Sequence, residues 1–280
     1  MGVPRSSFYA AKKPSEAKLR DRDLADHIAQ IQQKYFFTIG RRRMGTLLKK
    51  LHGIDVGTTR LQRVMSLYGL TAKIRQVRKA KPHAGKATQL ELPPNELNRE
   101  FKANKPYQRF VTDVTYVPYY EQNEWHWGYL SLVQDLFDRS IVSWVYSKKQ
   151  DNALARRTLQ LLSFLPLDKE AMLHSDRGSI YTANSFREIL KVMGVKQSFS
   201  RTANCHDNAT MECFNGTFKV EALYNPLFSK QRPSFMEQND VIARYIDFYN
   251  YDRPCSIVGN LTPVECRTKY FEAHQPADIL

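Results

Sequence analysis

The stretch that decides the fold runs from Arg109 to Tyr120 and reads Arg-Phe-Val-Thr-Asp-Val-Thr-Tyr-Val-Pro-Tyr-Tyr. It is dense in β-branched and aromatic residues, which fit the pleated surface of a strand. Two further runs of the same kind follow after short turns, Trp125–Val133 and Ser140–Tyr146. Three neighbouring strands with short connections predict an antiparallel meander.

Beyond the meander, helical and strand patterns alternate. Periodicity predicts a helix over Asn152–Phe164 and another over Asn184–Val192. Short apolar runs after them predict strands at Ala171–His174 and Lys196–Phe199. This order of elements, followed by more helices, predicts an α/β layer fold with a leading meander.

Positive charge is concentrated in the first third of the 280 residues. Residues 1–100 hold 21 Lys and Arg against 8 Asp and Glu, whereas residues 101–280 hold 21 against 20. A basic module joined to a near-neutral one indicates a polyanionic partner, most simply nucleic acid. A solubilising basic arm is the alternative. A membrane surface is a weaker one, because the basic residues do not line one amphipathic helix with a Trp or Phe face.

Three short helical patterns lie in this basic third, at 22–35, 41–51 and 58–68, with glycines between them. Short helices with tight turns predict a helix-turn-helix module, in which one helix enters the major groove. The expected DNA contacts are cations of the second and third helices, Arg41, Arg42, Arg43, Arg60 and Arg63. A plain three-helix bundle with a protein partner remains the alternative.

The chain divides into four predicted parts. They are the helix-turn-helix module at 1–70, a basic and Pro-containing linker at 71–104, the α/β core at 105–255 and a C-terminal tail at 256–280. No run approaches the roughly 18 apolar residues of a membrane span, and no apolar secretory signal opens the sequence. We therefore expect no membrane partner and a cytoplasmic location. The four cysteines form no C-x-x-C pair, so free thiols are expected and a structural zinc site is not.

Three acidic residues are the candidates for chemistry. Asp113 sits inside the first strand, where a charge is costly without a partner or a metal. Asp176 comes just after a strand, at the kind of sheet edge where α/β proteins place their sites, although a turn or cap role is equally open. Glu212 follows Asp176 after 35 intervening residues.

Glu212 belongs to a helix predicted within Ser200–Glu221, after a polar loop. Asp207 or Asn208 can cap the free N–H groups of that helix. Lys219 follows Glu212 by seven residues, about two turns, so both side chains project from roughly the same side. An ordinary solvated helix face would show the same pair.

Four blocks of sequence, in this order and with this spacing, resemble the catalytic core of the Asp-Asp-Glu transposases and retroviral integrases. They are Thr112–Tyr116, Asp135–Arg139, His174–Tyr181 and Asp207–Phe214. The likeness is greatest to the second-frame (OrfB) protein of bacterial insertion sequences, and it extends from about Ile28 to Glu265. It implies a ribonuclease H-like core, a mixed five-stranded sheet with flanking helices, preceded by the all-α helix-turn-helix module.

The resemblance also implies an activity: a DNA transposase that performs metal-dependent cleavage and strand transfer at insertion-sequence ends. Asp113 would bridge two Mg²⁺ ions, for which Mn²⁺ can substitute, while Asp176 and Glu212 would each hold one of them. Lys219 would contact DNA beside the scissile phosphate, and Asn208 would cap the helix of Glu212. His174 would contact DNA or orient Asp176, unless it is simply a packed histidine.

The partners implied by the resemblance are double-stranded DNA at the element ends and at the target, further copies of the chain, and a first-frame (OrfA) protein or a fusion with it. The implied location is the bacterial nucleoid. One departure stands at Arg253-Pro254-Cys255, where family members usually carry a histidine in place of Cys255. This departure keeps open a catalytically inactive DNA-binding regulator derived from a transposase. A ribonuclease H-like nuclease acting on RNA–DNA hybrids is the other alternative.

Overall fold

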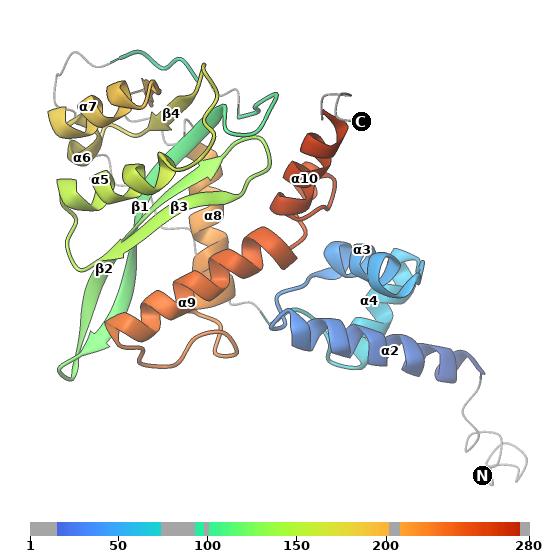
Figure 1. Cartoon of the computed structure of the whole chain (residues 1–280). Coiled ribbons are helices and arrows are strands. Elements are labelled where there is room, and N and C mark those ends of the chain that lie inside the picture. Colours follow the sequence, from blue (N-terminus) through green and yellow to red (C-terminus); the bar gives the residue numbers. More distant parts are fainter. Residues whose placement is uncertain (1–15, 74–92, 98–100, 202–207, 275–280) are drawn as a thin grey trace, which may run out of the picture. The chain divides into compact units, whose positions relative to one another are not determined.

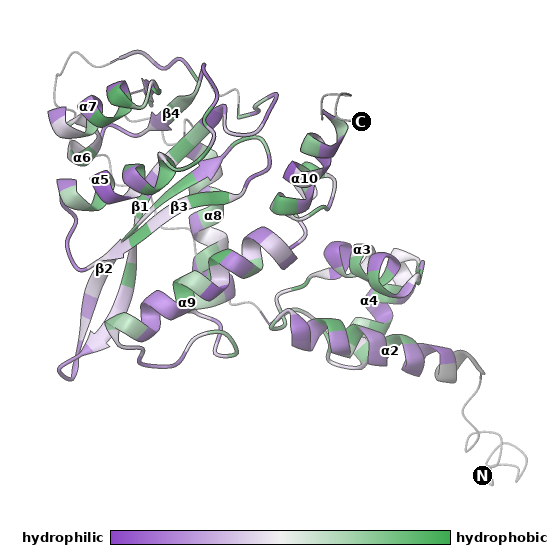
Figure 2. Cartoon of the chain, in the orientation of Figure 1, coloured by the Kyte–Doolittle hydropathy of each residue, from purple (hydrophilic) through white to green (hydrophobic). Residues whose placement is uncertain are grey.

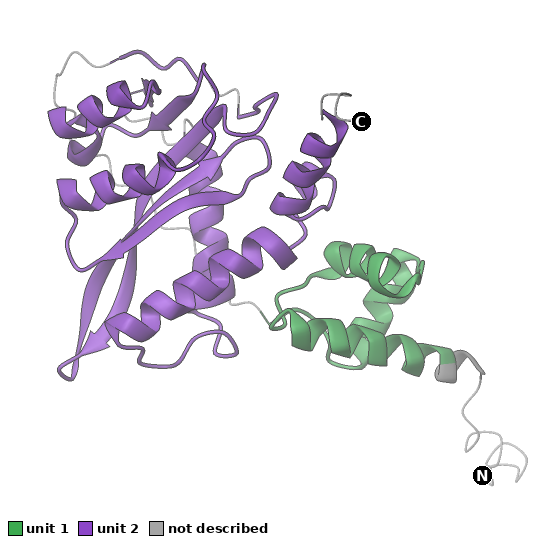
Figure 3. Cartoon of the chain, viewed as in Figure 1, with its two compact units in different colours: residues 1–74 green, residues 75–280 purple. Residues whose placement is uncertain are grey.

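The structure is a computed structural model that describes residues 16–73, 93–97, 101–201 and 208–274 (Figure 1). The chain forms two compact units, residues 1–74 and 75–280 (Figure 3). The first is helical and the second is built around a sheet. Each unit is described by itself below.

The described residues of unit 1 form three helices, α2 (Glu16–Lys34), α3 (Arg41–His52) and α4 (Thr58–Leu67), which confirms the predicted trio. Hydrophobic and hydrophilic residues alternate along α2 and α3, as one-sided burial requires (Figure 2). The buried stripes of the three helices meet in one small core, to which Ile28, Leu48 and Val64 contribute fully buried side chains. Helix α3 ends at Gly53, whose φ of 66° is the left-handed conformation that glycine adopts without steric cost.

Unit 2 is organised around a five-stranded sheet (Figure 1). Its strands are β1 (Arg109–Glu121), β2 (Glu124–Asp135), β3 (Ile141–Ser147), β4 (Met172–Ser175) and β5 (Lys196–Phe199). Their order is β3-β2-β1-β4-β5, and the first three pair antiparallel, which confirms the meander. Strand β4 pairs parallel with both β1 and β5, so the sheet is mixed, as the resemblance implies.

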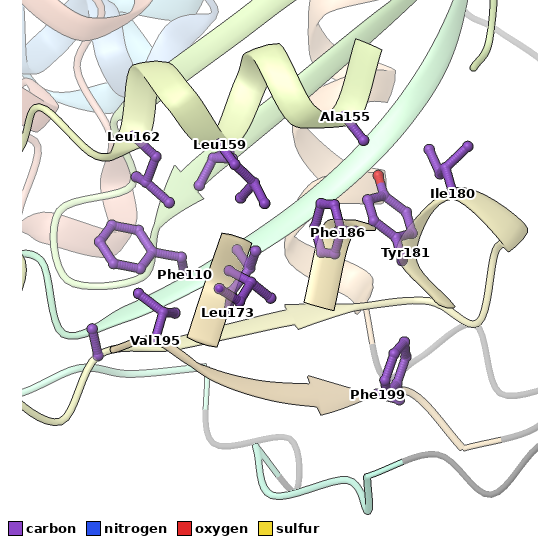
Figure 4. Packing of buried hydrophobic residues seen from close by; sticks show 13 residues of the cluster. Phe110, Ala155, Leu159, Leu162, Leu173, Ile180, Tyr181, Phe186, Val195 and Phe199 are labelled. Carbon is purple, nitrogen blue, oxygen red and sulfur yellow. The ribbon is translucent and has the colours of Figure 1, made fainter. Parts of the chain in front are cut away.

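Three helices cover one face of this sheet, α5 (Asn152–Leu162), α6 (Ser179–Thr182) and α7 (Asn184–Val192). Phe110 of β1 points to this face and packs in one buried cluster with Leu159 of α5 and Phe186 of α7 (Figure 4). Asp151 starts α5 by accepting a hydrogen bond from the backbone N–H of Leu154. The cluster therefore fixes the helical layer behind β1 and β4.

The other face of the sheet carries α8 (Ala209–Phe218) and α9 (Phe235–Asp247), each continued by one π-helical turn, η2 (Lys219–Leu223) and η3 (Phe248–Asp252). Aromatic rings join them: Phe214 lies 4.8 Å from Tyr249 and Phe218 lies 5.2 Å from Tyr245, between ring centroids. Tyr245 and Tyr249 are buried, so these two rings belong to the core. These contacts hold α8 against β1.

Two segments outside the predicted core also pack in unit 2. In the predicted tail, η4 (Ser256–Val258) is followed by α10 (Pro263–Ala273), where Arg267 donates to Asp138 at 2.6 Å. In the predicted linker, Ser198 of β5 accepts hydrogen bonds from the backbone N–H groups of Glu96 and Leu97. Residues 74–92 and 98–100 lie outside the described residues. Within the described ranges, none of the helices has the length and apolar character that crossing a membrane requires.

Candidate active site

Strands β1 and β4 bring Asp113 and Asp176 to the same edge of the sheet. Their parallel register pairs Arg109 with Met172 and Val111 with His174. Continuing that register by two residues would place Asp113 beside Asp176, which directly follows the last residue of β4. The carboxyl end of β4 is thus where the first two predicted acids meet.

The electrostatics of Asp113 show which charges lie near it. Burial, together with the negative charges of Asp176 and Glu212, raises the pKa of Asp113 to about 7. A hydrogen bond from the backbone N–H of Val114 and the positive charge of Lys219 oppose this rise. Asp176, Glu212 and Lys219 therefore all lie close enough to influence Asp113.

Asp176 lies at a more open position than Asp113. Its residue is exposed at the sheet edge, yet the packing around its carboxyl group still raises the pKa of Asp176. The backbone N–H of Gly178 donates to Asp176 Oδ1 at 2.8 Å and partly offsets that rise. This hydrogen bond fits the turn role that the sequence leaves open for Asp176. It also fits a role as a metal ligand, because the second carboxylate oxygen remains available.

Helix α8 carries Glu212 in its first turn and is bonded directly to β1. Asn215, three residues after Glu212, donates from Nδ2 to Asp113 Oδ2 at 2.8 Å. Asn208 donates from Nδ2 to the backbone carbonyl of Thr112 at 3.3 Å. Glu212 itself is exposed. Asn215 is missed by the sequence analysis, although its i+3 spacing from Glu212 places it on a neighbouring part of the same face.

The predicted cap of α8 is corrected. Asn208 does occupy the N-cap position, but its side chain makes no capping hydrogen bond. The reason is the contact with Thr112, which turns the carboxamide toward β1 instead of toward the first turn of the helix. Asp207 and the loop residues 202–206 lie outside the described residues.

The prediction that His174 contacts DNA is also wrong. The side chain is fully buried, and its ring nitrogens lie 2.9 Å and 3.0 Å from the hydroxyl groups of Ser198 and Ser200. His174 is therefore the packed histidine of the alternative reading. It ties β4 to β5 directly before the strand end that presents Asp176.

Lys219 lies on the Asp113 side of α8, at the start of the π-helical turn η2. Burial lowers the pKa of Lys219, and the charge of Asp113 opposes this shift. The ammonium group is half-buried near the acids and still reaches solvent. The spacing of Glu212 and Lys219 predicts that both project from the same side of the helix. This agrees with the electrostatic effect that both have on Asp113.

The donor chemistry of the site fits a hard divalent cation. Carboxylate oxygens are the ligands that Mg²⁺ prefers. The pKa of Asp113 is raised first by burial and then by the charge of Asp176, and a bound cation would oppose this rise. Among the described residues, however, no three His, Cys, Asp or Glu side chains converge closely enough to hold one ion. Forming a metal site from Asp113, Asp176 and Glu212 therefore requires a closer approach of their side chains.

The arginines of unit 1 divide into two groups. Arg41, Arg42 and Arg43 form the first turn of α3, where no acidic residue is present and positive charge opposes the helix macrodipole. A polyanion bound at this end would relieve that cost. Arg41 and Arg42 are exposed there.

Arg60 and Arg63 differ from the α3 arginines because both pair with the buried Asp21 of α2. The distances are 3.1 Å from Arg60 Nε to Asp21 Oδ1 and 2.7 Å from Arg63 Nη2 to Asp21 Oδ2. Their side chains stay 45% and 58% exposed. Both arginines thus join α4 to α2.

Backbone donors hold Asp135, which belongs to the second of the four resembling blocks. Its carboxylate accepts from the backbone N–H groups of Tyr107 and Phe137, both at 2.8 Å. The nearest cation among the described residues is Arg267, at 3.7 Å. Burial and the charge of Asp138 raise the pKa of Asp135 to about 7. This residue has a structural role away from the candidate metal site.

Domain models agree with this architecture. An integrase core domain matches residues 103–205, and a second integrase core domain model matches residues 193–263. An HTH-like domain matches residues 18–78. The core matches span β1 to η4 and include Asp113, Asp176 and Glu212.

Relatives align with nearly the whole chain. The protein named as transposase InsK of insertion sequence element IS150 from Escherichia coli (strain K12) is 34% identical over 270 residues, covering 96% of this chain and 91% of its own. The 31 kDa protein of insertion element IS600 from Shigella sonnei is 35% identical over 275 residues and 97% of each chain.

A retroviral structure shares the fold. In the simian T-cell lymphotropic virus intasome in complex with PP2A regulatory subunit B56 gamma, one chain is similar with a TM-score of 0.50 and 16% identity. The match covers 90% of this chain and 76% of that one. At this identity the likeness shows the fold alone, and it confirms the integrase-type core. With integrase core and HTH-like domains in one chain and relatives above 30% identity along nearly its full length, the protein belongs to the insertion-sequence transposases.

Proposed function

We propose that this chain catalyses metal-dependent cleavage and strand transfer at the ends of an insertion sequence. The observation that carries the proposal is the pairing of β1, which holds Asp113, with β4, which ends directly before Asp176, while the helix of Glu212 is bonded to Asp113. The effect of the Asp176 and Glu212 charges on the pKa of Asp113 supports it. Acids gathered beside the carboxyl end of β4 in an integrase-type core suit phosphoryl transfer.

Asp113, Asp176 and Glu212 would hold two Mg²⁺ or Mn²⁺ ions, with Asp113 shared between them. Bound ions of this kind polarise the phosphoryl group and stabilise the attacking and leaving oxygens of an in-line displacement. The protein then needs no nucleophile of its own: water attacks first, and the freed 3′-hydroxyl attacks the second phosphodiester. Lys219, half-buried beside Asp113, would hold a phosphate next to the scissile one.

The remaining parts of the chain would bring DNA to this site. Arg41 and Arg42, exposed at the start of α3, would bind backbone phosphates of the element end. An element has two ends, so the working enzyme would be a homo-oligomer. We further propose that the chain is the second-frame product, that it acts with a first-frame protein or as a fusion with it, and that it works on DNA in the bacterial nucleoid.

A joining assay tests the proposal. The substrate is a labelled duplex that carries the terminal repeat flanking the gene, incubated with Mg²⁺ and the full chain, with and without the first-frame protein. Asp113→Asn and Glu212→Gln should each lower the rates of cleavage and joining more than about 100-fold. This exceeds the effect of removing a residue that only orients a metal ligand. Glu188→Gln, at an exposed carboxylate on α7, is the control and should retain wild-type activity.

The outcomes separate this function from its alternatives. Undiminished activity in Asp113→Asn or Glu212→Gln would contradict the metal mechanism. Salt-sensitive DNA binding with no joining under any condition would identify a DNA-binding regulator, and faster cutting of an RNA–DNA hybrid would identify a nuclease. Cys255, which stands in place of the usual histidine, is buried and bonded through its backbone N–H to Leu261, so its side chain is part of the packing.

A further inference from the structure

Asn215 is a buried polar residue whose carboxamide contacts a predicted metal ligand. Only 8% of it is exposed, and Nδ2 lies 2.8 Å from Asp113 Oδ2. Its Oδ1 is buried too and has no hydrogen-bond partner among the described residues. An orphan acceptor costs stability, so an apolar residue of the same size would serve packing better. The benefit of an amide at this position therefore comes from the hydrogen bond that Nδ2 donates to Asp113.

We infer that Asn215 is a positioning residue that holds the Asp113 carboxylate from helix α8 and couples it to the helix that carries Glu212. The inference rests on the proposed function, because it concerns how the metal ligands are oriented. It assigns a task to a side chain that itself touches neither metal nor DNA.

The hydrogen-bond capacity of Asp113 explains what this positioning achieves. An ionised carboxylate offers about four lone-pair sites on its two oxygens. Asn215 occupies one on Oδ2, and the backbone N–H of Val114 also donates to the group. With its rotation stopped in this way, the remaining lone pairs point in fixed directions, as a ligand shared by two cations requires.

The donor itself is held by a rigid backing. Phe214 and Phe218, on either side of Asn215 in α8, are buried against the aromatic residues of α9 and η3. The second α8–β1 hydrogen bond, from Asn208 to the carbonyl of Thr112, stops the helix from sliding along the strand. Any shift of α8 that moves Glu212 is therefore transmitted to the Asp113 carboxylate through Asn215.

Manganese binding to the full chain, without DNA, tests the inference. Free Mn²⁺ is measured by its electron paramagnetic resonance signal as the metal-free protein is titrated. Asn215→Leu keeps the branched shape and the same number of side-chain heavy atoms but has no donor, and we expect it to weaken Mn²⁺ binding by about 10- to 100-fold. Asn215→Gln keeps the donor on a longer stem and should recover part of the affinity. Asn215→Ser serves as the donor-shortened variant if Asn215→Leu does not fold.

A matched control distinguishes positioning from stability. Asn250 is another buried amide of unit 2, and it exchanges two hydrogen bonds of 2.9 Å with the backbone of Ile141. Asn250→Ala should lower the thermal midpoint and leave the Mn²⁺ dissociation constant unchanged. For Asn215→Leu we expect the opposite: the affinity for Mn²⁺ falls, and the thermal midpoint stays close to that of the wild type.

The possible results fall into distinct classes. Wild-type Mn²⁺ affinity in a folded Asn215→Leu or Asn215→Ser variant would overturn the positioning role while leaving the proposed function intact. If the wild-type chain binds no Mn²⁺, or if Asp113→Asn binds it equally well, the proposed metal function itself fails. Reduced affinity in Asn215→Leu and Asp113→Asn, with partial recovery in Asn215→Gln, supports both.

Discussion

A buried ion pair behind the candidate site gives the prediction whose magnitude follows most directly from the structure. Arg253 donates from Nε and Nη2 to the two carboxylate oxygens of Glu221, at 2.8 Å and 3.0 Å. The two side chains are only 12% and 3% exposed. Tyr245 donates its hydroxyl to the same carboxylate at 3.0 Å. Glu221 lies in η2, the turn that continues α8 and holds Lys219, so the pair anchors the end of the helix that carries Glu212.

Replacing Arg253 with methionine removes the guanidinium and leaves the Glu221 carboxylate buried without it. Burial alone would lower the pKa of Arg253, yet the charge of Glu221 raises it, which shows that the attraction outweighs desolvation. Breaking a buried pair on one side costs about 3–5 kcal/mol of unfolding free energy. The double variant Glu221→Gln/Arg253→Met removes both charges, and it should therefore lose less than Arg253→Met alone.

Urea unfolding followed by tryptophan fluorescence measures this loss of unfolding free energy for unit 2, which contains Arg253 and Glu221. All three tryptophans, Trp125, Trp127 and Trp144, belong to residues 75–280, so the signal reports on unit 2 without interference from unit 1. Arg253→Met should unfold at a much lower urea concentration than the wild type. A loss below about 1 kcal/mol, the range of exposed ion pairs, would refute the reasoning.

Three further predictions concern the site, the DNA-binding unit and the sheet. Because burial and nearby acids raise the pKa of Asp113 from 3.8 to about 7, the metal-free wild type should lose stability as pH rises through this window. In chelator at pH 8, Asp113→Asn should be more stable than the wild type by on the order of 2–4 kcal/mol in urea unfolding, with little difference at pH 4, and parallel pH curves would contradict this. Arg41→Ala and Arg42→Ala should each reduce the salt dependence of DNA binding by about one unit of log–log slope on any sequence, whereas an unchanged slope would place the DNA elsewhere. Gly128→Ala would put a Cβ 2.3 Å from the Tyr146 hydroxyl oxygen, so a loss of about 1–3 kcal/mol is expected in thermal unfolding, and wild-type stability would show that the Tyr146 ring can move aside.

Local pattern was sufficient for most of the secondary structure. The β-branched and aromatic run at Arg109–Tyr120 predicts β1, and the helix over Asn184–Val192 and the strand over Lys196–Phe199 begin and end as predicted. Such elements are encoded in the side-chain period itself. Helix α6 was missed because its four residues are too few to show a period.

The assembly of the site depends on contacts between distant residues. Single residues pointed to Asp113 and Asp176, but only the parallel pairing of β1 with β4 brings their strands together. Nothing in the local sequence distinguishes Asn215 from an ordinary helix residue, and its role depends on a hydrogen bond to a strand 102 residues earlier. The sequence therefore identifies the ligands more readily than the groups that orient them.

Three local expectations were changed by tertiary contacts. Asn208 has the residue type and position of a cap, but the carbonyl of Thr112 takes its side chain. Arg60, which the sequence suggests as a DNA contact, donates to Asp21, 39 residues earlier. His174 resembles a site residue beside Asp176 and is buried between two serines. In each case a polar group found a partner that local sequence does not reveal.

Whether Asp113, Asp176 and Glu212 share one metal site is tested most directly by anomalous diffraction from crystals of the full chain with Mn²⁺ and DNA carrying the element end. We expect two peaks about 3.5–4 Å apart, with carboxylate oxygens of all three residues about 2 Å from an ion and Asp113 between both peaks. Manganese bound elsewhere in the presence of DNA, or a Glu212 carboxylate that stays away from the ions, would contradict the proposed catalytic centre.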